Sequence, residues 1–319
     1  MEYLLPPRLK LGDKVGVISP SSTIKHRREE YERAAARLEQ GLGIKLVPAK
    51  NAFNSFYYSG GTIQERLDDF HDMVCDREIK GIIFSAGGNS AIDLVDKLNY
   101  ALIKKNPKII AGISDACTFL NSIAARTGLI AYEGFEFFDF NRGPVGDYGF
   151  AYLEKAWFKE SIGETFANPS WRNFGNLATR YRGWRTFRPG KAEGVVAGGN
   201  LSVILNLIDT PYFPELDGSI LACESYLLSK RDINARYKVL RLKKVFEKIS
   251  GLIVGYNHGS DDPKILGNDR DIKDIVLEAT AGYDFPIMEV GEIGHRVENI
   301  ILPIGGKAKL DATNRTLKL

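Results

Sequence analysis

The sequence predicts a two-domain α/β protein, with a parallel-sheet domain in its first half and a smaller, β-rich domain in its second. Its 319 residues amount to about two domains of ordinary size. Short apolar strands alternate with amphipathic helices as far as residue 125, which is typical of βαβ units. Beyond residue 194 the strands continue but helices are few. We expect the domains to span 1–165 and 191–319, with 166–190 as a linker or loop.

Each βα unit of the first half is predicted to begin with a short run of apolar and β-branched residues. These expected strands are 15–19, 44–47, 81–84 and 109–113. The expected helices are 25–42, 61–75, 91–98 and 116–125. In the first helix Tyr31, Ala34, Ala35 and Leu38 share one face, which is therefore expected to cover the sheet. Ligands are expected in the loops at the carboxyl ends of such strands.

Residues 141–190 differ in character from both halves. They are rich in Gly, Asn, Arg and aromatic residues and have poor periodicity, which predicts an irregular loop or hairpin at the boundary. No acidic residue occurs between Phe166 and Ala192, a stretch that contains Arg172, Arg180, Arg182, Arg185, Arg188 and Lys191. Farther on, strands are expected at 195–197, 219–223, 252–254, 286–290 and 300–302, and a basic amphipathic helix at 233–248.

The composition excludes several classes of protein. With 44% hydrophobic and 26% charged residues, the chain is typical of a soluble globular protein and not of a disordered one. Its net charge of +3 is too small for general binding to nucleic acid or to a membrane surface. The N-terminus lacks the features of a signal peptide, and no window approaches the ~18 apolar residues of a membrane span. We expect a cytoplasmic protein with neither a nucleic-acid nor a membrane partner.

The cysteines and the known metal motifs predict chemistry without a metal. Cys75, Cys117 and Cys223 lie far apart and form no CxxC pair, which argues against a disulfide framework and a structural zinc site. The sequence has no HExxH motif and no aspartate-rich calcium loop. We therefore expect no metal and no cofactor.

Ser114 is the first candidate for a catalytic residue, because it stands between an expected strand and an expected helix. Small residues lie two positions before it (Gly112) and two after it (Ala116). A serine on a tight strand-to-helix turn needs such neighbours, since bulky side chains would clash there. The turn would raise the hydroxyl above the sheet and offer the Asp115 amide to a developing oxyanion. The alternative is that Ser114 only caps the helix.

The segment Ser85-Ala-Gly-Gly-Asn-Ser90 follows the preceding strand in the same way. Adjacent Gly87 and Gly88 allow backbone amides to approach a ligand, so they could supply a second oxyanion donor or a phosphate cradle. A plain turn between strand and helix is the alternative. The segment matches neither a dinucleotide-binding glycine motif nor a P-loop.

A nucleophilic serine requires a base, and the chain has four histidines. His26 lies in a basic run expected on a solvated helix face, and His71 lies within an expected helix. His258 and His295 lie in polar loops after strands, where catalytic groups commonly occur, and the pattern does not choose between them. Glu224 ends an apolar strand, where a carboxylate could orient the imidazole or be an ordinary strand-end charge.

Seven segments together resemble a known family. They are Leu11–Ser22, Tyr58–Leu67, Asn106–Asp115, Gly198–Leu201, Thr210–Pro214, Gly218–Glu224 and Gly294–Gly305. On these segments the chain is similar, nearly end to end, to the serine LD-carboxypeptidases of peptidase family S66. That family includes the muramoyltetrapeptide carboxypeptidases and the microcin C7 self-immunity proteins. The resemblance implies a flavodoxin-like N-terminal domain, a smaller β-rich C-terminal domain and a metal-free cytoplasmic hydrolase, usually a homodimer.

The resemblance also implies a catalytic triad. It assigns the nucleophile to Ser114 and the carboxylate to Glu224, and it selects His295 over His258 as the base. The amides of Gly88 and Asp115 would then hold the oxyanion. The chain departs from the family's usual residues at Ile113, Phe135 and Ser225, which lie beside these positions and so affect substrate choice more than hydrolysis.

The resemblance implies two kinds of substrate. One branch releases the terminal D-Ala of murein tetrapeptides across an L-D bond, and the other cleaves the amide between an amino acid and a modified nucleotide. Trp171 lies where the microcin-immunity branch has a base-stacking tryptophan, and an aromatic ring among arginines suits a nucleobase and a phosphate, although packing is the alternative. We favour an aminoacyl-nucleotide substrate. The alternatives are a murein tetrapeptide LD-carboxypeptidase in cell-wall recycling and a non-catalytic protein that binds a peptide or nucleotide.

Overall fold

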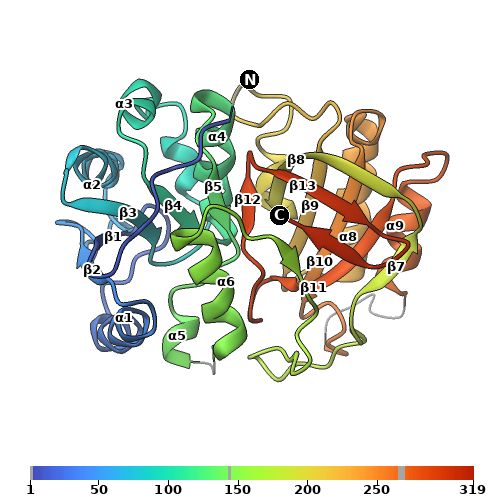
Figure 1. The fold of residues 1–319 in the computed structure, drawn as a ribbon, viewed down its shortest axis with the longest axis horizontal. Helices are drawn as coiled ribbons and strands as arrows, with labels where there is room; N and C mark the ends of the chain where they lie inside the picture. Colours follow the sequence, from blue (N-terminus) through green and yellow to red (C-terminus); the bar gives the residue numbers. More distant parts are fainter. Residues whose placement is uncertain (1–2, 143–144, 265–269) are drawn as a thin grey trace.

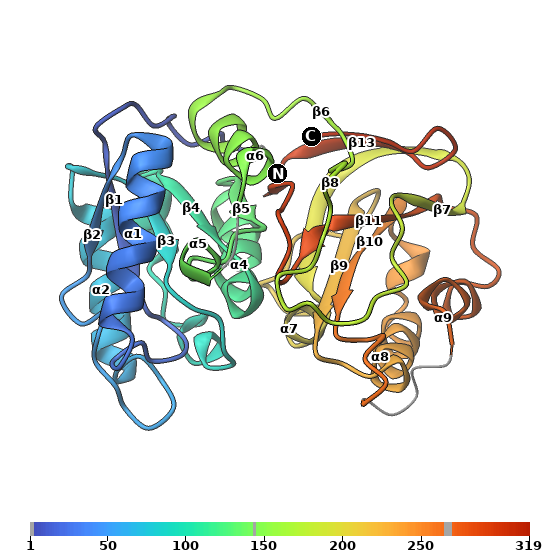
Figure 2. The ribbon, with the colours of Figure 1, turned by 90° about the horizontal axis from the view of Figure 1, so that it is seen from below.

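The computed structural model describes residues 3–142, 145–264 and 270–319. The first half of the chain builds one sheet with helices on its two faces, and the second half builds another sheet with its own helices (Figures 1 and 2). The two halves lie side by side, with β12 between them in both views. Among the described residues, no helix has the length and the apolar character needed to cross a membrane.

The first sheet has the strand order β12-β5-β4-β3-β1-β2. Its strands are β1 (Lys14–Ile18), β2 (Lys45–Pro48), β3 (Ile79–Phe84), β4 (Ile109–Gly112), β5 (Ala131–Glu133) and β12 (Leu302–Ile304). The pairs among β1 to β5 are parallel, and the order 2-1-3-4-5 is that of flavodoxin-like folds. Strand β12 joins antiparallel to β5. A segment near the end of the chain therefore completes the sheet of the first half.

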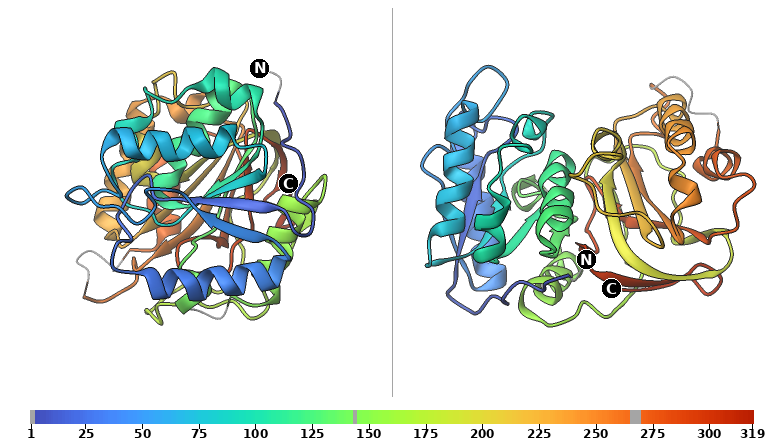
Figure 3. Two further views of the ribbon diagram at one scale, coloured as in Figure 1. Left: turned by 90° about the vertical axis from the view of Figure 1, so that its left-hand side faces the viewer. Right: turned by 90° about the horizontal axis from the view of Figure 1, so that it is seen from above.

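The helices of the first half cover both faces of this sheet, and α1 and α2 lie on opposite faces (Figure 3). They are α1 (Arg28–Leu42), α2 (Ile63–Cys75), η1 (Ala91–Leu94), α3 (Tyr100–Lys105), η2 (Ser114–Ala116), α4 (Cys117–Thr127), α5 (Asp139–Arg142) and α6 (Asp147–Phe158). The predicted face of α1 is buried, as its spacing requires. Helix α2 is preceded by the N-cap residue Thr62, which forms a reciprocal capping box with Glu65.

The second sheet has the strand order β6-β14-β13-β8-β9-β10-β11-β7. Its strands are β6 (Glu164–Thr165), β7 (Arg185–Arg188), β8 (Lys191–Asn200), β9 (Ile220–Tyr226), β10 (Gly251–His258), β11 (Ile287–Gly294), β13 (Lys307–Asp311) and β14 (Thr316–Lys318). Strands β8 to β11 are parallel to one another. The helices of this half are α7 (Leu201–Leu205), α8 (Lys230–Leu242), η3 (Val245–Glu247) and α9 (Ile272–Ala279).

Two predictions about local structure were wrong, and a third had the wrong bounds. The helix expected at 91–98 is only the short turn η1. The basic helix expected at 233–248 is present, but it begins at Lys230 and ends at Leu242. The expected irregular segment contains α6, which buries Tyr152, Leu153, Ala156 and Trp157. Glycine and aromatic residues of low helix propensity obscured its pattern, and tertiary burial of the aromatic side chains overrides that propensity.

Candidate active site

The strand-to-helix turn after β4 holds Ser114 in a strained backbone conformation. Its φ of +69° lies in the left-handed region, which non-glycine residues adopt rarely and at a cost of order 1–3 kcal/mol. A Cβ on Gly112 would lie 2.7 Å from the Cβ of Ala116, so the turn needs the small residues at these two positions. Neither η2 nor α4 is capped by a side-chain hydrogen bond, so Ser114 is not a helix cap. The Ser114 side chain remains partly accessible.

The loop after β3 brings its two glycines close to this turn. A Cβ on Gly87 would lie 2.7 Å from the Cβ and 2.8 Å from the Oγ of Ser114, so only glycine allows the two backbones to approach this closely. Gly88 has a φ of +148°, and a Cβ there would lie 2.4 Å from the hydroxyl oxygens of Ser21 and Ser22. The loops after β1, β3 and β4 therefore meet at one edge of the sheet, where doubly wound folds bind ligands.

Glu224 and His295 form a buried hydrogen-bonded pair at the corresponding edge of the second sheet. Glu224 lies near the end of β9, and His295 directly follows β11. The Nδ1 atom of His295 is 2.6 Å from Oε2 of Glu224. The side-chain amide of Asn200 donates to the other carboxylate oxygen at 2.9 Å. With both of its oxygens engaged, Glu224 is held in one orientation and can fix the imidazole tautomer.

Two hydrogen bonds join the second sheet, close to this pair, to helix α4 after the Ser114 turn. The Asn200 backbone N–H donates to Sγ of Cys117, at 3.4 Å, and Cys117 begins the helix that follows Ser114. A Cβ on Gly199 would lie 2.3 Å from the same sulfur, so a glycine is required for this approach. Farther along α4, the Asn121 side chain donates to the Gly198 carbonyl at 2.8 Å. These contacts place the end of β8, whose Asn200 also bonds Glu224, against the helix that follows Ser114.

Buried carboxyl groups set the electrostatics of this region. Burial acts to lower the pKa of His295, but the Glu224 carboxylate, with smaller contributions from Glu136 and Glu133, raises it above its ordinary value. Burial and the nearby Glu224 carboxylate raise the pKa of Glu133 to about 8. One oxygen of Glu133 has no hydrogen-bond partner among the described residues. We expect Glu133 to stay protonated near neutral pH.

The structure separates the two histidines that the sequence pattern left open. His258 was expected in a loop, but it is the last residue of β10 and is buried. Its Nδ1 atom has no hydrogen-bond partner in the described part of the chain. Burial and the positive charges of His295 and Arg296 lower its pKa to about 4. His258 stacks on Tyr226, whose ring also lies 4.7 Å from that of His295.

The other two histidines lie outside the site. His71 accepts a hydrogen bond from the Asn99 backbone at 3.0 Å and is satisfied structurally. His26 is exposed, but it lies on a turn before α1 and not on the helix face that was expected. Among the described residues, no group of three or more His, Cys, Asp or Glu side chains is arranged to hold a metal ion.

Trp171 is half-buried in an aromatic cluster. Its indole N–H donates to the Gly291 carbonyl at 2.8 Å, and its ring packs against Tyr181 and Tyr256. It lines a hollow of about 560 Å³ together with Arg172 and other residues of the 168–183 segment. The Phe174 backbone in this segment donates to the carbonyl of Arg296 at 2.7 Å, which places the segment beside His295.

Most of the basic stretch before Ala192 is engaged within the protein. Arg185 pairs with Glu289 and Asp271, and Lys191 pairs with Asp311. Arg180 pairs with Asp261, while Arg182 and Arg188 donate to backbone carbonyls. The acidic partners of Arg180, Arg185 and Lys191 come from distant segments of the chain. A larger hollow of about 820 Å³ lies between the 164–167 segment and β13–β14, and none of the predicted site residues lines it.

Sequence reasoning missed two residues of this region. Asn200 pairs with Glu224 in the parallel register of β8 and β9, and Glu133 ends β5 beside Gly112. The one available signal was the position of each polar residue at the end of an apolar strand. That signal does not reveal which polar side chains the two sheets bring together.

A strained serine on the turn after a parallel strand, in a chain that also holds a carboxylate-bound histidine after another strand, is typical of the class of serine amide hydrolases. Comparison with known proteins agrees with this class. The LD-carboxypeptidase N-terminal domain (peptidase S66) matches residues 15–134, and the LD-carboxypeptidase C-terminal domain matches residues 193–310. The chain therefore belongs to the LD-carboxypeptidase family, peptidase family S66, and is a serine carboxypeptidase or amide hydrolase.

Several relatives match this chain along nearly its whole length. The microcin C7 self-immunity protein MccF of Escherichia coli is 30% identical over 99% of this chain and 95% of its own. The probable murein peptide carboxypeptidase of Bacillus subtilis is 28% identical over 98% of this chain and 92% of its own. The solved structure of MccF in complex with aspartyl sulfamoyl adenosine superposes with a TM-score of 0.89 at 29% identity, covering 99% of this chain and 98% of MccF.

Proposed function

We propose that this protein is a metal-free serine hydrolase in which Ser114 is the nucleophile, His295 the general base and Glu224 the residue that orients the base. The observation that carries the proposal is the 2.6 Å contact between His295 Nδ1 and Glu224 Oε2, which leaves Nε2 as the atom available to Ser114. The Asp115 and Gly88 amides are assigned to the oxyanion. No cofactor is required by this chemistry.

The reaction is acyl transfer to serine followed by hydrolysis. His295 Nε2 takes the proton of the Ser114 hydroxyl while Oγ attacks the amide carbonyl, and the two amides stabilise the negative charge on its oxygen. The C–N bond breaks as the imidazolium gives its proton to the leaving amine. Water, deprotonated by His295, then attacks the Ser114 ester and releases the acid.

We favour an aminoacyl-nucleotide as the substrate. Two observations support this choice: the likeness to MccF, solved with aspartyl sulfamoyl adenosine, and the position of the Trp171 segment beside His295. The hollow at Trp171 offers aromatic surface and arginine side chains, which suit a nucleobase and a phosphate or its analogue. The packing of Trp171 against two tyrosines limits its freedom, so the nucleotide would meet its remaining exposed face.

A murein tetrapeptide is the second candidate substrate, because a relative of nearly equal similarity is named a probable murein peptide carboxypeptidase. In that reaction the leaving group is D-Ala, which carries a free carboxylate and has no nucleobase. The same triad would serve both reactions, and the two differ in what binds beyond the scissile amide. We also propose, from the family resemblance, that the protein acts in the cytoplasm as a homodimer.

The test is a paired hydrolysis assay with wild-type protein and the Ser114→Ala variant. Each is incubated with an aspartyl sulfamoyl-adenylate and with a murein tetrapeptide, and the products are identified by mass spectrometry. We expect the wild type to release aspartate from the adenylate, and Ser114→Ala to reduce the rate at least about 10⁴-fold. Ser122→Ala, which removes a buried hydroxyl from α4, is the matched control and should retain activity.

Each result has a distinct meaning. Release of D-Ala alone would assign the protein to cell-wall recycling and overturn the aminoacyl-nucleotide proposal. Equal rates for wild type and Ser114→Ala would remove Ser114 from the mechanism. Absence of turnover on both substrates, together with no labelling of Ser114 by a fluorophosphonate, would favour a protein that only binds its ligand.

A further inference from the structure

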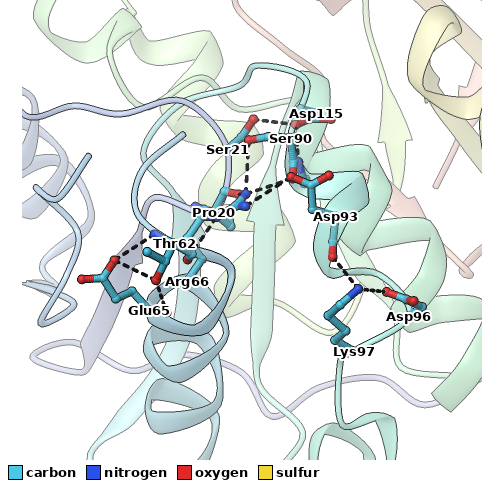
Figure 4. A network of polar contacts seen from close by, with 11 residues as sticks. Pro20, Ser21, Thr62, Glu65, Arg66, Ser90, Asp93, Asp96, Lys97 and Asp115 are labelled. Atoms are coloured by element: carbon cyan, nitrogen blue, oxygen red, sulfur yellow. Dashed lines mark hydrogen bonds and ion pairs between the residues drawn. The ribbon is translucent and has the colours of Figure 1, made fainter. Parts of the chain in front are cut away.

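Two residues outside the triad hold the loops around Ser114 in place. One is Arg66 of α2, which is almost completely buried, and the other is Asp115, the residue after the nucleophile (Figure 4). Arg66 contacts the loop after β1, residues 19–22, and the loop after β3, residues 85–90. Asp115 contacts the first of these loops and Ala91, the residue that follows the second. The triad does not account for either side chain.

The Arg66 guanidinium contacts backbone oxygens from both loops. Its Nη1 atom donates to the carbonyl of Pro20 at 2.8 Å and to the carbonyl of Ser90 at 2.9 Å. The same nitrogen lies 3.2 Å from the Ser90 hydroxyl, and Nη2 pairs with Asp93 at 3.3 Å. A planar guanidinium can address several acceptors at fixed angles, whereas a lysine ammonium at this depth is a single point charge.

The Asp115 carboxylate also bonds to both of these regions, the loop after β1 and the Ser90–Ala91 peptide. Its Oδ2 atom accepts from the Ser21 hydroxyl at 2.5 Å and from the Ala91 backbone N–H at 2.8 Å. The carbonyl of Ser90 and the N–H of Ala91 belong to one peptide group. Arg66 therefore holds one end of that peptide and Asp115 holds the other, through charge-assisted hydrogen bonds, which are the stronger kind.

Gly87 connects these contacts to Ser114. The Ser22 backbone N–H donates to the Gly87 carbonyl at 3.1 Å, which joins the two loops directly. Gly87 in turn lies against the side chain of Ser114. Arg66 and Asp115 hold the Ser90–Ala91 peptide, three residues from Gly87, and thereby restrain the Gly87–Gly88 backbone beside Ser114.

We propose that Arg66 is a positioning residue for hydrolysis: with Asp115, it fixes the Ser90–Ala91 peptide and thereby holds the Gly87–Gly88 amides at the oxyanion position. The inference rests on the proposed function, because it assumes that Ser114 is acylated. Displacement of an oxyanion donor destabilises the transition state for acylation, but it leaves the affinity of the protein for the unreacted reagent almost unchanged. The expected signature is a lower maximal rate of acylation at nearly constant affinity.

The experiment measures phosphonylation of Ser114 by a fluorophosphonate in the full-length protein, as a maximal inactivation rate and an apparent dissociation constant. The variants are Arg66→Lys, Asp115→Asn and the double variant. Arg188→Lys is the matched control, because Arg188 also donates to a carbonyl and a hydroxyl, those of Thr280, in the second half of the chain. Thermal unfolding of each protein accompanies the kinetics.

We expect Arg66→Lys to lower the maximal rate about 10- to 100-fold with the dissociation constant within twofold of wild type. Arg188→Lys should retain the wild-type rate even if its unfolding temperature falls as far as that of Arg66→Lys. Because both residues act on one peptide, the double variant should be slowed much less than the product of the single effects. Asp115→Asn keeps the Asp115 amide, so its slowing reports on the carboxylate.

A maximal rate within twofold of wild type in folded Arg66→Lys would overturn the inference and leave the proposed function standing. So would equal slowing in Arg188→Lys. If Arg66→Lys does not fold, Asp115→Asn decides: a wild-type rate in it would show that acylation does not need the Asp115 carboxylate on the Ser90–Ala91 peptide, and would overturn the inference. If the wild type itself is not labelled at Ser114, the proposed function fails and this inference fails with it.

Discussion

In the first half of the chain, the candidate nucleophile is held by backbone geometry, whereas in the second half the candidate base is held by buried charge. Ser114 sits at a φ of +69°, and Gly87 and Gly112 give it room. Arg66 and Asp115 then hold the loops beside it by hydrogen bonds to backbone groups. The backbone conformation of this turn and of the loops beside it therefore sets the position of Ser114.

The second half positions His295 in another way. The imidazole is buried and bonded to Glu224, whose second oxygen accepts from Asn200. The Glu224 carboxylate outweighs burial and raises the pKa of His295. The position of the base and its proton affinity therefore depend on the same contact.

Because of this difference, substitutions in the two halves should change the pH dependence of the acylation rate in different ways. A change near Ser114 should lower the rate equally at every pH, because no titrating group is altered. A change near His295 should lower the rate and also shift the pH at which activity appears. A pH profile of Ser114 phosphonylation can distinguish the two, since acylation requires neutral His295.

Glu224→Gln is expected to have the largest effect of these substitutions. It keeps the shape of the side chain, but it removes the charge and places an amide opposite Nδ1, so the imidazole loses its preferred tautomer. We expect the rate of phosphonylation to fall about 10³- to 10⁴-fold. The wild-type rate should fall as the pH drops through a pKa above 6.5, and in Glu224→Gln this midpoint should move to lower pH.

The control for this prediction is Glu289→Gln, which neutralises a buried carboxylate bound to Arg185 in the same half. It should leave the midpoint of the pH profile in place. A Glu224→Gln profile with the wild-type midpoint would show that the carboxylate does not set the proton affinity of the base, and the contrast between the halves would be lost.

Gly87→Ala probes the other half and should have a smaller effect. The new methyl group would lie within 2.8 Å of the Ser114 side chain, so either the loop or the serine must shift. We expect the rate to fall about 10²-fold, as for a displacement of about 1 Å, with an unchanged midpoint in the pH profile. Gly146→Ala is the control, because its methyl group would make only ordinary contacts, at 3.5 Å. A shifted midpoint in Gly87→Ala would contradict the assignment.

Much of the first half was predictable because its apolar runs are short and its helices have clear faces. The same pattern placed Ser114 on a turn between strand and helix, which the structure confirms. Helix α6 escaped prediction because its glycine and aromatic residues have low helix propensity, and burial against the rest of the fold stabilises it.

The partners of the site could not be derived from local pattern. His258 ends β10 and His295 directly follows β11. They differ in that Glu224, 71 positions from His295 along the chain, bonds to one of them. Arg66 was indistinguishable from any other arginine of an amphipathic helix. Its importance arises from carbonyl groups that two separate loops bring to it.

His258 is expected to affect stability and not activity. Its pKa is about 4 in the folded protein and about 6.5 when unfolded. Unfolding therefore takes up a proton between these values, so the free energy of unfolding should fall as the pH drops through this window. The shift corresponds to a loss of up to about 3 kcal/mol.

His258→Gln removes this titration, so the variant should lose less stability than the wild type between pH 6.5 and pH 4 in urea denaturation. Glu133 acts in the opposite direction, because its raised pKa makes the fold more stable as the pH falls from about 8. The comparison must therefore be made between the two proteins and not against a flat baseline. His26→Gln, at an exposed position, is the control and should follow the wild type. If the stability of His258→Gln shows the same pH dependence as that of the wild type, His258 takes up its proton in the folded protein as readily as in the unfolded one. Burial would then not lower the pKa of this histidine, and the second half would tolerate a buried charge without a carboxylate partner such as Glu224.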